Sequence, residues 1–347
     1  MPGFDRDLLF LYTEDARIKL KDLALFLKKS PQRLKYNISQ LEKQKLVHNA
    51  HSIIDYSFFG LLLFRVYFKG GYVSEKDKSA ILQKLAGHPY IVSVYELSGE
   101  FDLVIEIESP NASRFNKQLK RLIHQLPALN NYKIVLNIVT HIYPRSYLIK
   151  NSRLLKDQTF ASRLDRSIIV GGDREIEKFT KQEMAVLEQV LLHPKTHLSK
   201  LATLSDLNIK TLVAVLKGLH KRKILRSFQH LIDTNALEIY KHRLFLKLHN
   251  LTSERESELQ DYFTKTPEIV QVHKTVGDWD IEVDVEAMEK NTIRYLIVQL
   301  REEFTDLIET FNSMEFYQYH DKTFLPQYLF ESESKKEMVV PIKEEKK

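Results

Sequence analysis

The chain of 347 residues contains no cysteine. It therefore has no disulfide bond, no thiolate ligand for zinc or an iron–sulfur cluster, and no thiol nucleophile. Glycine and proline number only ten each, which excludes collagen-like and Pro/Gly low-complexity chains. The most apolar run, residues 56–68, includes Arg65 and is too short to span a bilayer. The start MPGFDRDLL lacks the basic-then-apolar layout of a signal peptide, so we expect a soluble, cytosolic protein without a membrane partner.

Motifs of several enzyme classes are also missing. The chain has no Gly-x-Gly-x-x-Gly motif, no Walker-type phosphate loop and no Gly-x-Ser-x-Gly motif. Its 13 histidines include no His-Glu-x-x-His or comparable ligand spacing. His48 and His51 lie in a stretch expected to be extended, where they would face opposite sides. The sequence therefore predicts a non-enzyme with no catalytic residue, no metal and no cofactor.

The composition permits packed domains and a polyanionic partner. Hydrophobic residues make up 43% of the chain, which excludes wholesale disorder, and the length favours two or more domains. The net charge is +6. Residues 28–48 are the most informative stretch, because they contain six lysine and arginine residues and only one acidic residue, Glu42. A basic helix in this stretch would suit phosphate groups.

The sequence repeats itself after a shift of 178 residues. Residues 88–109 then fall on residues 266–287 without a gap. Identical matches in this segment include Pro89, Ile91, Val92, Val94, Gly99 and Asp102 with Pro267, Ile269, Val270, Val272, Gly277 and Asp280. One register kept over so long a stretch predicts two copies of a module of about 150 residues.

Each copy is expected to begin with helices and to end with mixed structure. In the first copy, helices are predicted at 5–12 and 20–27, and a third begins with Ser30 as N-cap and Pro31 at the first helical position. An extended wing is predicted at 46–54. The later elements are expected in the order strand 61–68, helix 74–85, strands 91–97 and 102–108, helix 112–126 and strand 132–143. In strand 102–108 apolar residues alternate with Val104, Glu106 and Glu108, which predicts one buried and one polar face.

A winged helix-turn-helix followed by a βαββαβ unit resembles the Lrp/AsnC (leucine-responsive/asparagine regulator, or feast/famine) family. The resemblance is carried by FDRDLLFLYTEDARIKLKDLALFLKKSPQRLKYNISQLEKQKLV, then by Asp55, Gly60 and the Gly-x-x-Asp turn at 99–102. Residues 4–143 cover one family unit, and residues 180–325 a more diverged one. The resemblance implies transcription regulators that bind DNA through the helical domain. It also implies that their sandwich domains dimerise and often hold amino-acid effectors.

The repeat and the resemblance together predict an α+β chain with two winged helix-turn-helix domains, each followed by a ferredoxin-like βαββαβ (RAM-type) sandwich domain. The predicted segments are a winged helix-turn-helix at 1–58, a βαββαβ ligand and dimerisation domain at 59–143, a basic linker with a short strand at 144–173, a second, degenerate winged helix-turn-helix at 174–236, a second βαββαβ domain at 237–325, and a disordered tail at 326–347. Most family members carry one unit per chain, so the fusion suggests that the sandwich domains pair within one polypeptide.

The third helix of the first copy is the candidate DNA-reading element. Its polar residues away from the apolar stripe are Gln32, Arg33, Tyr36, Asn37 and Gln40, while Lys28, Lys29 and Lys35 suit phosphates. A solvated helix face is the alternative. Asn37 stands where family members usually have arginine. In the second copy the five positions become Lys210, Thr211, Ala214, Val215 and Gly218, which predicts a helix that packs on protein or touches phosphates only. A second reader with altered specificity remains the alternative.

The Gly-x-x-Asp turns are candidate effector sites. They comprise Gly99, Glu100, Phe101 and Asp102 in the first copy and Gly277, Asp278, Trp279 and Asp280 in the second. Backbone amides and a fixed carboxylate could hold the two ends of an amino acid. The alternative is a tight strand connection in which glycine supplies a positive φ and aspartate caps the turn.

These features predict a sequence-specific transcription regulator that binds double-stranded DNA, with an amino acid or another small effector at the sandwich interface. One competent reading helix per chain would read half of a palindrome, so we expect a homo-oligomer, at least a dimer. The sirohaem decarboxylases share this architecture and are enzymes built as paired units, which makes a tetrapyrrole enzyme the alternative function. An interaction protein that senses a metabolite is a third reading.

Overall fold

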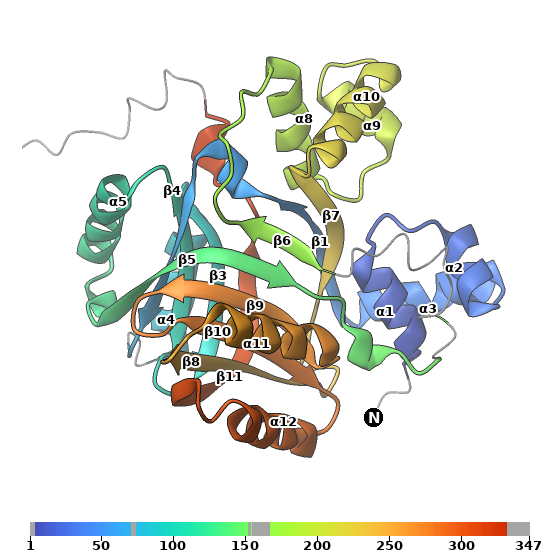
Figure 1. Ribbon diagram of the computed structural model, residues 1–347. Coiled ribbons are helices and arrows are strands. Elements are labelled where there is room, and N and C mark those ends of the chain that lie inside the picture. Colours follow the sequence, from blue (N-terminus) through green and yellow to red (C-terminus); the bar gives the residue numbers. More distant parts are fainter. Residues whose placement is uncertain (1–3, 71–73, 152–153, 155–166, 332–347) are drawn as a thin grey trace, which may run out of the picture.

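The computed structural model describes residues 4–70, 74–151, 154 and 167–331. Within these ranges the order of elements is the same in the two halves of the chain (Figure 1). Each half begins with three helices and one strand, and a βαββαβ unit follows. This order matches the predicted α+β class and the predicted succession of elements. None of the helices in the described ranges combines the length and apolar character needed to cross a bilayer.

The first helix-turn-helix forms where the sequence predicts it. Its elements are α1 (Arg6–Glu14), α2 (Leu20–Leu27), α3 (Pro31–Lys43) and the wing strand β1 (Val47–Ile54). Ser30 caps α3 by accepting a hydrogen bond from the Arg33 amide, and Pro31 opens the helix. Leu34 and Leu41 are buried against the wing residue Val47. The cap and the apolar stripe thus fix which face of α3 is free.

The second helix-turn-helix follows the same plan. It consists of α8 (Lys181–Leu192), α9 (Leu198–Leu204), α10 (Ile209–Lys221) and the wing strand β7 (Leu225–Ile232). Asn208 caps α10 through the Thr211 amide at 2.8 Å. Its apolar stripe is buried in one cluster with residues of both wings. The two wings pair with each other as an antiparallel sheet, with Ser52 opposite Phe228, so the two helical domains are joined through their wings (Figure 1).

The two βαββαβ units close into one ring of strands. The first unit is β2 (Leu62–Phe68), α4 (Glu75–Ala86), β3 (Ile91–Ser98), β4 (Leu103–Ser109), α5 (Ala112–Gln125) and β5 (Tyr132–Ile142). The second is β8 (Tyr240–Leu248), α11 (Ser253–Lys265), β9 (Ile269–Val276), β10 (Ile281–Ala287), α12 (Lys290–Glu303) and β11 (Ile308–Lys322). The sheet order is β2-β4-β3-β11-β8-β10-β9-β5-β6, and an additional β2–β5 pairing closes the ring. The edge strands of one copy therefore pair with those of the other, at β3–β11 and β5–β9.

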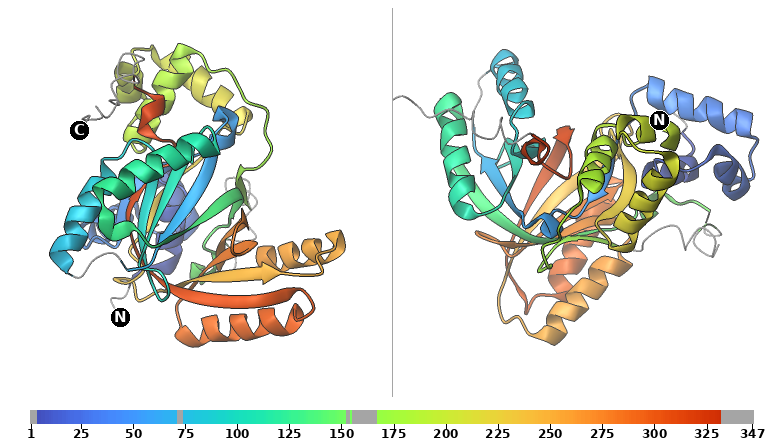
Figure 2. Two further views of the ribbon diagram at one scale, coloured as in Figure 1. Left: turned by 90° about the vertical axis from the view of Figure 1, so that its left-hand side faces the viewer. Right: turned by 90° about the horizontal axis from the view of Figure 1, so that it is seen from above.

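Helices cover the outer faces of this ring. In Figure 2, α4 and α5 lie on one flank and α11 and α12 on the other. Each helix pair buries a separate apolar cluster against its own half-sheet. The inner faces of the two half-sheets face each other. The structure therefore buries both faces of every half-sheet, one under helices and one against the other copy.

The polar face predicted for strand 102–108 is present but is not exposed to solvent. Glu108 is 1% exposed, and Glu282 and Asp284 on the matching strand β10 are 0% exposed. The predicted polar face is therefore buried as well. The closed ring turns these carboxylates inward, where Arg65 pairs with Glu282 and Arg243 with Asp284.

The segment between the copies contributes to the packing. The predicted short strand is β6 (Ile168–Gly171), which extends the sheet beside β5. The 3-10 turn η3 (Ser146–Leu148) precedes it. Arg145, expected in a basic linker, is buried and pairs with Glu14 at 3.1 Å and with Glu286 at 3.0 Å. The rest of the predicted linker, at 152–153 and 155–166, lies outside the described residues.

The first residues of the predicted disordered tail have a defined structure, contrary to the expectation. Residues 326–331 are ordered and contain the 3-10 turn η4 (Gln327–Leu329). The ring of Tyr328 stacks on that of Tyr90 with 4.1 Å between centroids, which anchors this turn to the first sandwich domain. Residues 332–347 lie outside the described residues.

Candidate functional site

The outer face of α3 carries the residues predicted to read DNA. Gln32, Arg33, Lys35 and Tyr36 are exposed, and the ring of Tyr36 retains 62% of its surface. Asn37 and Gln40 are half-buried at the edge of the same helix. Exposed arginine and glutamine side chains on a capped, packed helix are held in a geometry that a DNA groove can meet.

The two lysines before α3 differ in their surroundings. Lys28 is exposed and ends α2 in the left-handed conformation, with φ of 52°. Lys29 instead forms an ion pair with Asp5, whose other oxygen caps α1. Lys28 therefore offers its charge to solvent more fully than Lys29 does.

The corresponding face of α10 is more apolar. Lys210 and Ala214 are exposed, whereas Val215 is half-buried and packs against the apolar cluster beneath the second wing. Arg222, part of the basic run after this helix, bonds to Glu177 and Glu183 within its own domain. This helix thus presents fewer hydrogen-bonding side chains than α3.

The Gly-x-x-Asp turns are occupied by contacts within the protein. The Asp102 carboxylate accepts a hydrogen bond from the Gly70 amide at 2.6 Å, and that of Asp280 accepts one from the Leu248 amide at 2.8 Å. Gly99 has φ of 150°, and a Cβ there would lie 3.2 Å from Met314 of the other copy. Each aspartate thus ties its turn to the end of the neighbouring strand, β2 or β8, and the first turn packs tightly on the second copy.

The aromatic residues of these turns point into the ring. Phe101 and Trp279 are buried in one cluster with residues of both copies. The Trp279 indole donates to Glu282 at 2.7 Å. At the surface, Lys133 lies 2.8 Å from Asp278 and 3.6 Å from Glu100, so it bridges the two turns. The structure brings both predicted effector turns together around Lys133.

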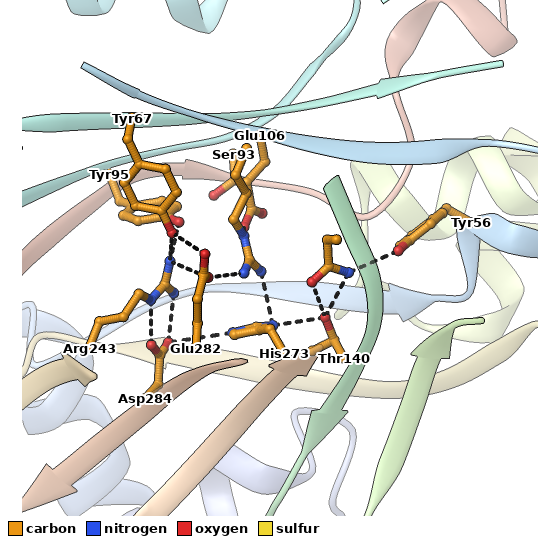
Figure 3. Close-up of polar contacts among 12 residues, drawn as sticks. Tyr56, Tyr67, Ser93, Tyr95, Glu106, Thr140, Arg243, His273, Glu282 and Asp284 are labelled. Carbon is orange, nitrogen blue, oxygen red and sulfur yellow. Dashed lines mark hydrogen bonds and ion pairs between the residues drawn. The ribbon is translucent and has the colours of Figure 1, made fainter. Parts of the chain in front are cut away.

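Inside the ring lies a buried polar network (Figure 3) that the sequence did not reveal as a site. Arg65 and Arg243 occupy equivalent positions of the repeat, and both are almost fully buried. Arg65 Nε lies 2.7 Å from Glu106, and Arg243 binds both oxygens of Asp284 at 2.6 and 2.9 Å. Each arginine thus pairs with the carboxylate directly opposite it in its own copy.

The same arginines also contact the other copy. Arg65 donates to Glu282 and, at 2.9 Å, to Nδ1 of His273. Glu282 further accepts from Tyr67 at 2.8 Å. Arg243 donates to the hydroxyl of Tyr95 in the first copy. The network therefore ties the two copies together through charge-assisted hydrogen bonds.

The network is charged, and the pKa directions follow from its contacts. Burial disfavours the charged guanidinium of Arg65, but Glu282 and Glu106 outweigh burial and raise its pKa well above the usual value. Burial likewise opposes ionisation of Asp284, but Arg243 brings its pKa well below the usual value. Burial and the nearby Arg65 lower the pKa of His273. The arginines and Asp284 are therefore ionised, whereas His273 is neutral.

The ring interior holds little free space. The hollow bounded by Arg65, Glu106, His273 and Lys322 measures about 30 Å³. That volume holds one or two water molecules. Across the described part of the chain, no three His, Asp or Glu side chains converge as a metal site would require. The interior as it stands is a packed junction between copies.

Two sequence signals pointed to this network. Arg65 interrupts the most apolar run of the chain, and the shift of 178 residues places Arg243 at the same position of the second copy. The cross-copy partner Glu282 gave no such signal, because its counterpart in the first copy is Val104. Only the closed ring brings Glu282 to Arg65.

Comparison with known proteins agrees with this architecture. Residues 1–47 match a winged helix-turn-helix DNA-binding family, and residues 65–146 match the Lrp/AsnC ligand-binding domain. The HTH-type transcriptional regulator FL11 of Pyrococcus horikoshii is 25% identical over 142 residues, which cover 40% of this chain and 89% of that protein. FL11 of Pyrococcus furiosus is 22% identical over 124 residues, or 34% of this chain and 78% of that protein.

A solved structure resembles the whole chain in fold. The siroheme decarboxylase NirDL superimposes with a TM-score of 0.56 over 92% of this chain and 93% of its own, at 12% identity. The similarity extends through both copies and shows the shared fold alone.

The fold and the exposed helix define a protein of the winged helix-turn-helix class, in which a helical domain and a sandwich unit occur twice. The domain matches place it further: the chain carries the domains of the Lrp/AsnC family, and the resemblance seen in the sequence is confirmed. Both family matches lie in the first copy.

Replacing Arg65 with methionine tests the network. Arg65→Met leaves Glu282 and Glu106 buried with fewer cations, so we expect the free energy of unfolding to fall by roughly 3–5 kcal/mol. Lys133→Met, which breaks an exposed bridge between the copies, should cost about 1 kcal/mol or less. Urea unfolding of both variants measures the difference. Adding Glu282→Gln to Arg65→Met should recover part of the lost stability. An equal loss of stability in Arg65→Met and Lys133→Met would contradict the role assigned to Arg65.

Buried histidines give the protein a second testable property. The Nδ1 atom of His230 lies 2.8 Å from the carbonyl of His48, and its Nε2 atom is buried without a partner. Burial lowers the pKa of His230 to about 4. Below about pH 6.5 the unfolded chain therefore takes up a proton that the folded chain does not. The contribution of His230 to the free energy of unfolding is fully present above that pH and is lost as the pH falls towards 4.

We expect the free energy of unfolding to decrease between pH 6.5 and 5, by at most roughly 1.4 kcal/mol per pH unit for each such histidine. His230→Gln should make this decrease shallower. His124→Gln, at an exposed position, is the matched control and should leave the slope unchanged. Urea unfolding at several pH values measures both slopes. A slope in His230→Gln equal to that of the wild type would contradict the prediction.

Proposed function

We propose that the chain is a sequence-specific regulator of transcription that reads double-stranded DNA with α3 of its first copy. The observation that carries this proposal is the exposed face of α3, where Gln32, Arg33 and Tyr36 stand free on a capped helix. Arginine and glutamine offer paired donors and acceptors that match base edges in the major groove. One family match includes this helix and another follows it in the chain, and both support the same role.

Phosphate contacts would hold α3 in register. Lys28 and Lys35 are exposed next to the reading face and carry no assigned protein partner among the described contacts. Such contacts add affinity for any DNA and weaken with salt, because binding releases counterions. In this proposal the lysines supply affinity for any DNA, and Gln32 and Arg33 supply the choice of sequence.

The second helix-turn-helix serves mainly as a structural partner in this proposal. Val215 is half-buried on protein, and Ala214 offers no hydrogen bond through its side chain. One chain then supplies one reading helix. Two half-sites about one DNA turn apart require two chains, so the DNA-bound form is at least a homodimer. An amino acid or another small molecule would act as effector of this assembly.

A sirohaem-decarboxylase-like enzyme is the second candidate, because the fold likeness to NirDL extends over 92% of the chain. The hollow of about 30 Å³ inside the ring is far smaller than a tetrapyrrole, but hollows of about 650 and 710 Å³ lie beside the wings. The family matches, rather than the free volume, favour the regulator. The absorption spectrum of the purified protein with added sirohaem separates the two. A stable Soret-type shift together with loss of carboxylate groups would support the enzyme.

Substitutions on α3 should separate sequence choice from general affinity. Gln32→Ala with Arg33→Ala should reduce discrimination by roughly 1–3 kcal/mol per lost base contact. Lys28→Ala should weaken all sequences about equally and flatten the salt dependence. Titrations of preferred and scrambled DNA at several salt concentrations measure both effects. Wild-type preference in the double variant would show that α3 is not the reading helix.

Substitutions on α10 should leave sequence choice intact. Val215→Asn places an amide against an apolar cluster, so we expect lower stability of about 1–3 kcal/mol and an unchanged preferred sequence. Lys210→Ala, on the exposed side, should alter affinity slightly and preference not at all. The preferred DNA sequence of both variants is compared with that of Arg33→Ala. A shift in preferred sequence from either α10 variant as large as that from Arg33→Ala would show that both helices read bases.

A further inference from the structure

The first wing and the end of β11 enclose a groove that no assigned role explains. One hollow of about 650 Å³ lies between the wings and β11, and a neighbouring one of about 710 Å³ lies between the first wing, α8 and the segment after β11. The two hollows share Ala50, His51, Asp321 and Lys322. We refer to the two together as the wing groove. It lies apart from the turns at 99–102 and 277–280.

Unpaired groups gather where the two hollows meet. His51 is 8% exposed, and its Nδ1 atom is buried without a hydrogen-bond partner. Its ring stacks on that of Phe324 with 5.6 Å between centroids, which fixes its position. Nε2 of His230, which lines the first hollow, is also unpaired. Buried polar atoms without partners are uncommon in folded proteins and call for a partner.

Lys322 adds a cation at the same place. Its ammonium lies 4.8 Å from the ring centroid of Tyr319 and 5.4 Å from that of Phe324. Within the described ranges it forms no ion pair. Burial is the main cause that lowers its pKa to about 8, so it is mostly charged at neutral pH. Glu106 and Asp284 inside the ring also attract its charge, but they are paired with Arg65 and Arg243. A half-buried ammonium without an ion pair of its own would gain from an anion.

The acidic residues near this point do not supply that anion. Glu42 already bonds to Lys195 at 2.9 Å and to the hydroxyl of Tyr12 at 2.6 Å. Burial raises the pKa of Asp321. The first hollow is also lined by Lys45 and Lys195, so cations outnumber carboxylates around it. The charge balance of the first hollow therefore favours an oxyanion, whereas Glu188 and Glu331 line the second hollow.

The second hollow is suited to an apolar body. Leu191 and Leu192 of α8 line one part of it, and Leu325 and Phe330 line another. The side chain of Leu192 is 58% exposed there. A free phosphate would use only the charged end, whereas a carboxylate with an apolar body would use both hollows. Covering exposed leucine surface adds to the affinity.

We propose that the wing groove binds an organic carboxylate with an apolar body, whose carboxylate lies between Lys322 and His51 and whose body lies along Leu191 and Leu192. If the proposed DNA-binding function holds, this site has a regulatory consequence. β1 follows α3 directly in the chain, so a ligand that bridges β1 and β11 fixes the position of the reading helix relative to the ring. The carboxylate is then an effector that acts through the wing.

Calorimetric titration of the full chain without DNA tests the site. Hexanoate and phenylacetate are the probes, and hexanol and inorganic phosphate are the comparison compounds. Both carboxylates should bind, and Lys322→Met should weaken them roughly tenfold or more, because a charge-assisted hydrogen bond is lost. Lys84→Met, at an exposed position on α4, is the matched control and should bind as the wild type does.

Two further variants guard against a folding defect. His51→Phe keeps a ring to stack on Phe324 but removes the nitrogen atoms, and it should also weaken both probes. Leu192→Glu places a charge at an exposed position of the apolar hollow and should weaken them by repulsion. Equal affinity in Lys322→Met and the wild type would overturn the proposal. So would binding of inorganic phosphate alone, or no binding of either carboxylate.

DNA titrations with and without hexanoate test the coupling separately. A change in DNA affinity that Lys322→Met abolishes is expected. Hexanoate binding that leaves DNA affinity unchanged would overturn the regulatory role. Failure of the protein to bind specific DNA in the absence of hexanoate would count against the proposed function, while the calorimetric result would still decide whether the groove binds carboxylates.

Discussion

The contact between Arg65 and Glu282 is the interaction on which the arrangement of the two copies depends. It joins two strands that come from different copies, and both side chains are nearly inaccessible to water. Ion pairs at such sites contribute little net stability, but an unmatched charge there is costly. Because the first copy has Val104 in place of Glu282, two first copies facing each other would leave this guanidinium without its second carboxylate. The network thus favours unlike copies as partners within one chain.

Pairing within one chain fixes the positions of the helical domains. The ring brings the chain ends of both sandwich domains to one side, where β1 and β7 pair. Both helix-turn-helix units are therefore held whether or not each reads DNA. Under this constraint α10 can lose its hydrogen-bonding side chains and keep its apolar stripe, while α3 retains the polar face. In the proposed function, this divergence of α10 from α3 leaves one reading helix per chain.

The sequence predicted the elements well because local signals determine them. The Ser30–Pro31 start of α3, the apolar stripe at Leu34 and Leu41, and the short strand after the linker all follow from spacing and capping. The repeat extended these assignments to the second copy. The polar contacts across the copies did not follow, because strands far apart in sequence come together only when the ring closes. For this reason the polar face of the strand could be predicted, but its burial between the copies could not.

The candidate sites, too, could be predicted only where a local pattern in the sequence marks them. The face of α3 follows from helical periodicity, and the structure places Gln32 and Arg33 on its exposed side. The Gly-x-x-Asp turns were recognised by motif, yet their aspartates bind the backbone at the ends of the neighbouring strands. The wing groove combines His51, Lys322 and Leu192 from three distant segments, and none of these residues is part of a local motif. Such a site requires the tertiary structure.

Selection of bound fragments from a random pool of double-stranded DNA, with the purified full chain and at recorded salt concentrations, tests the central claim most directly. The account predicts enrichment of paired half-sites about ten base pairs apart, bound by two chains. It also predicts a preference for these sites that persists as salt weakens binding to all DNA. An unenriched pool whose binding varies with salt alone would contradict the account.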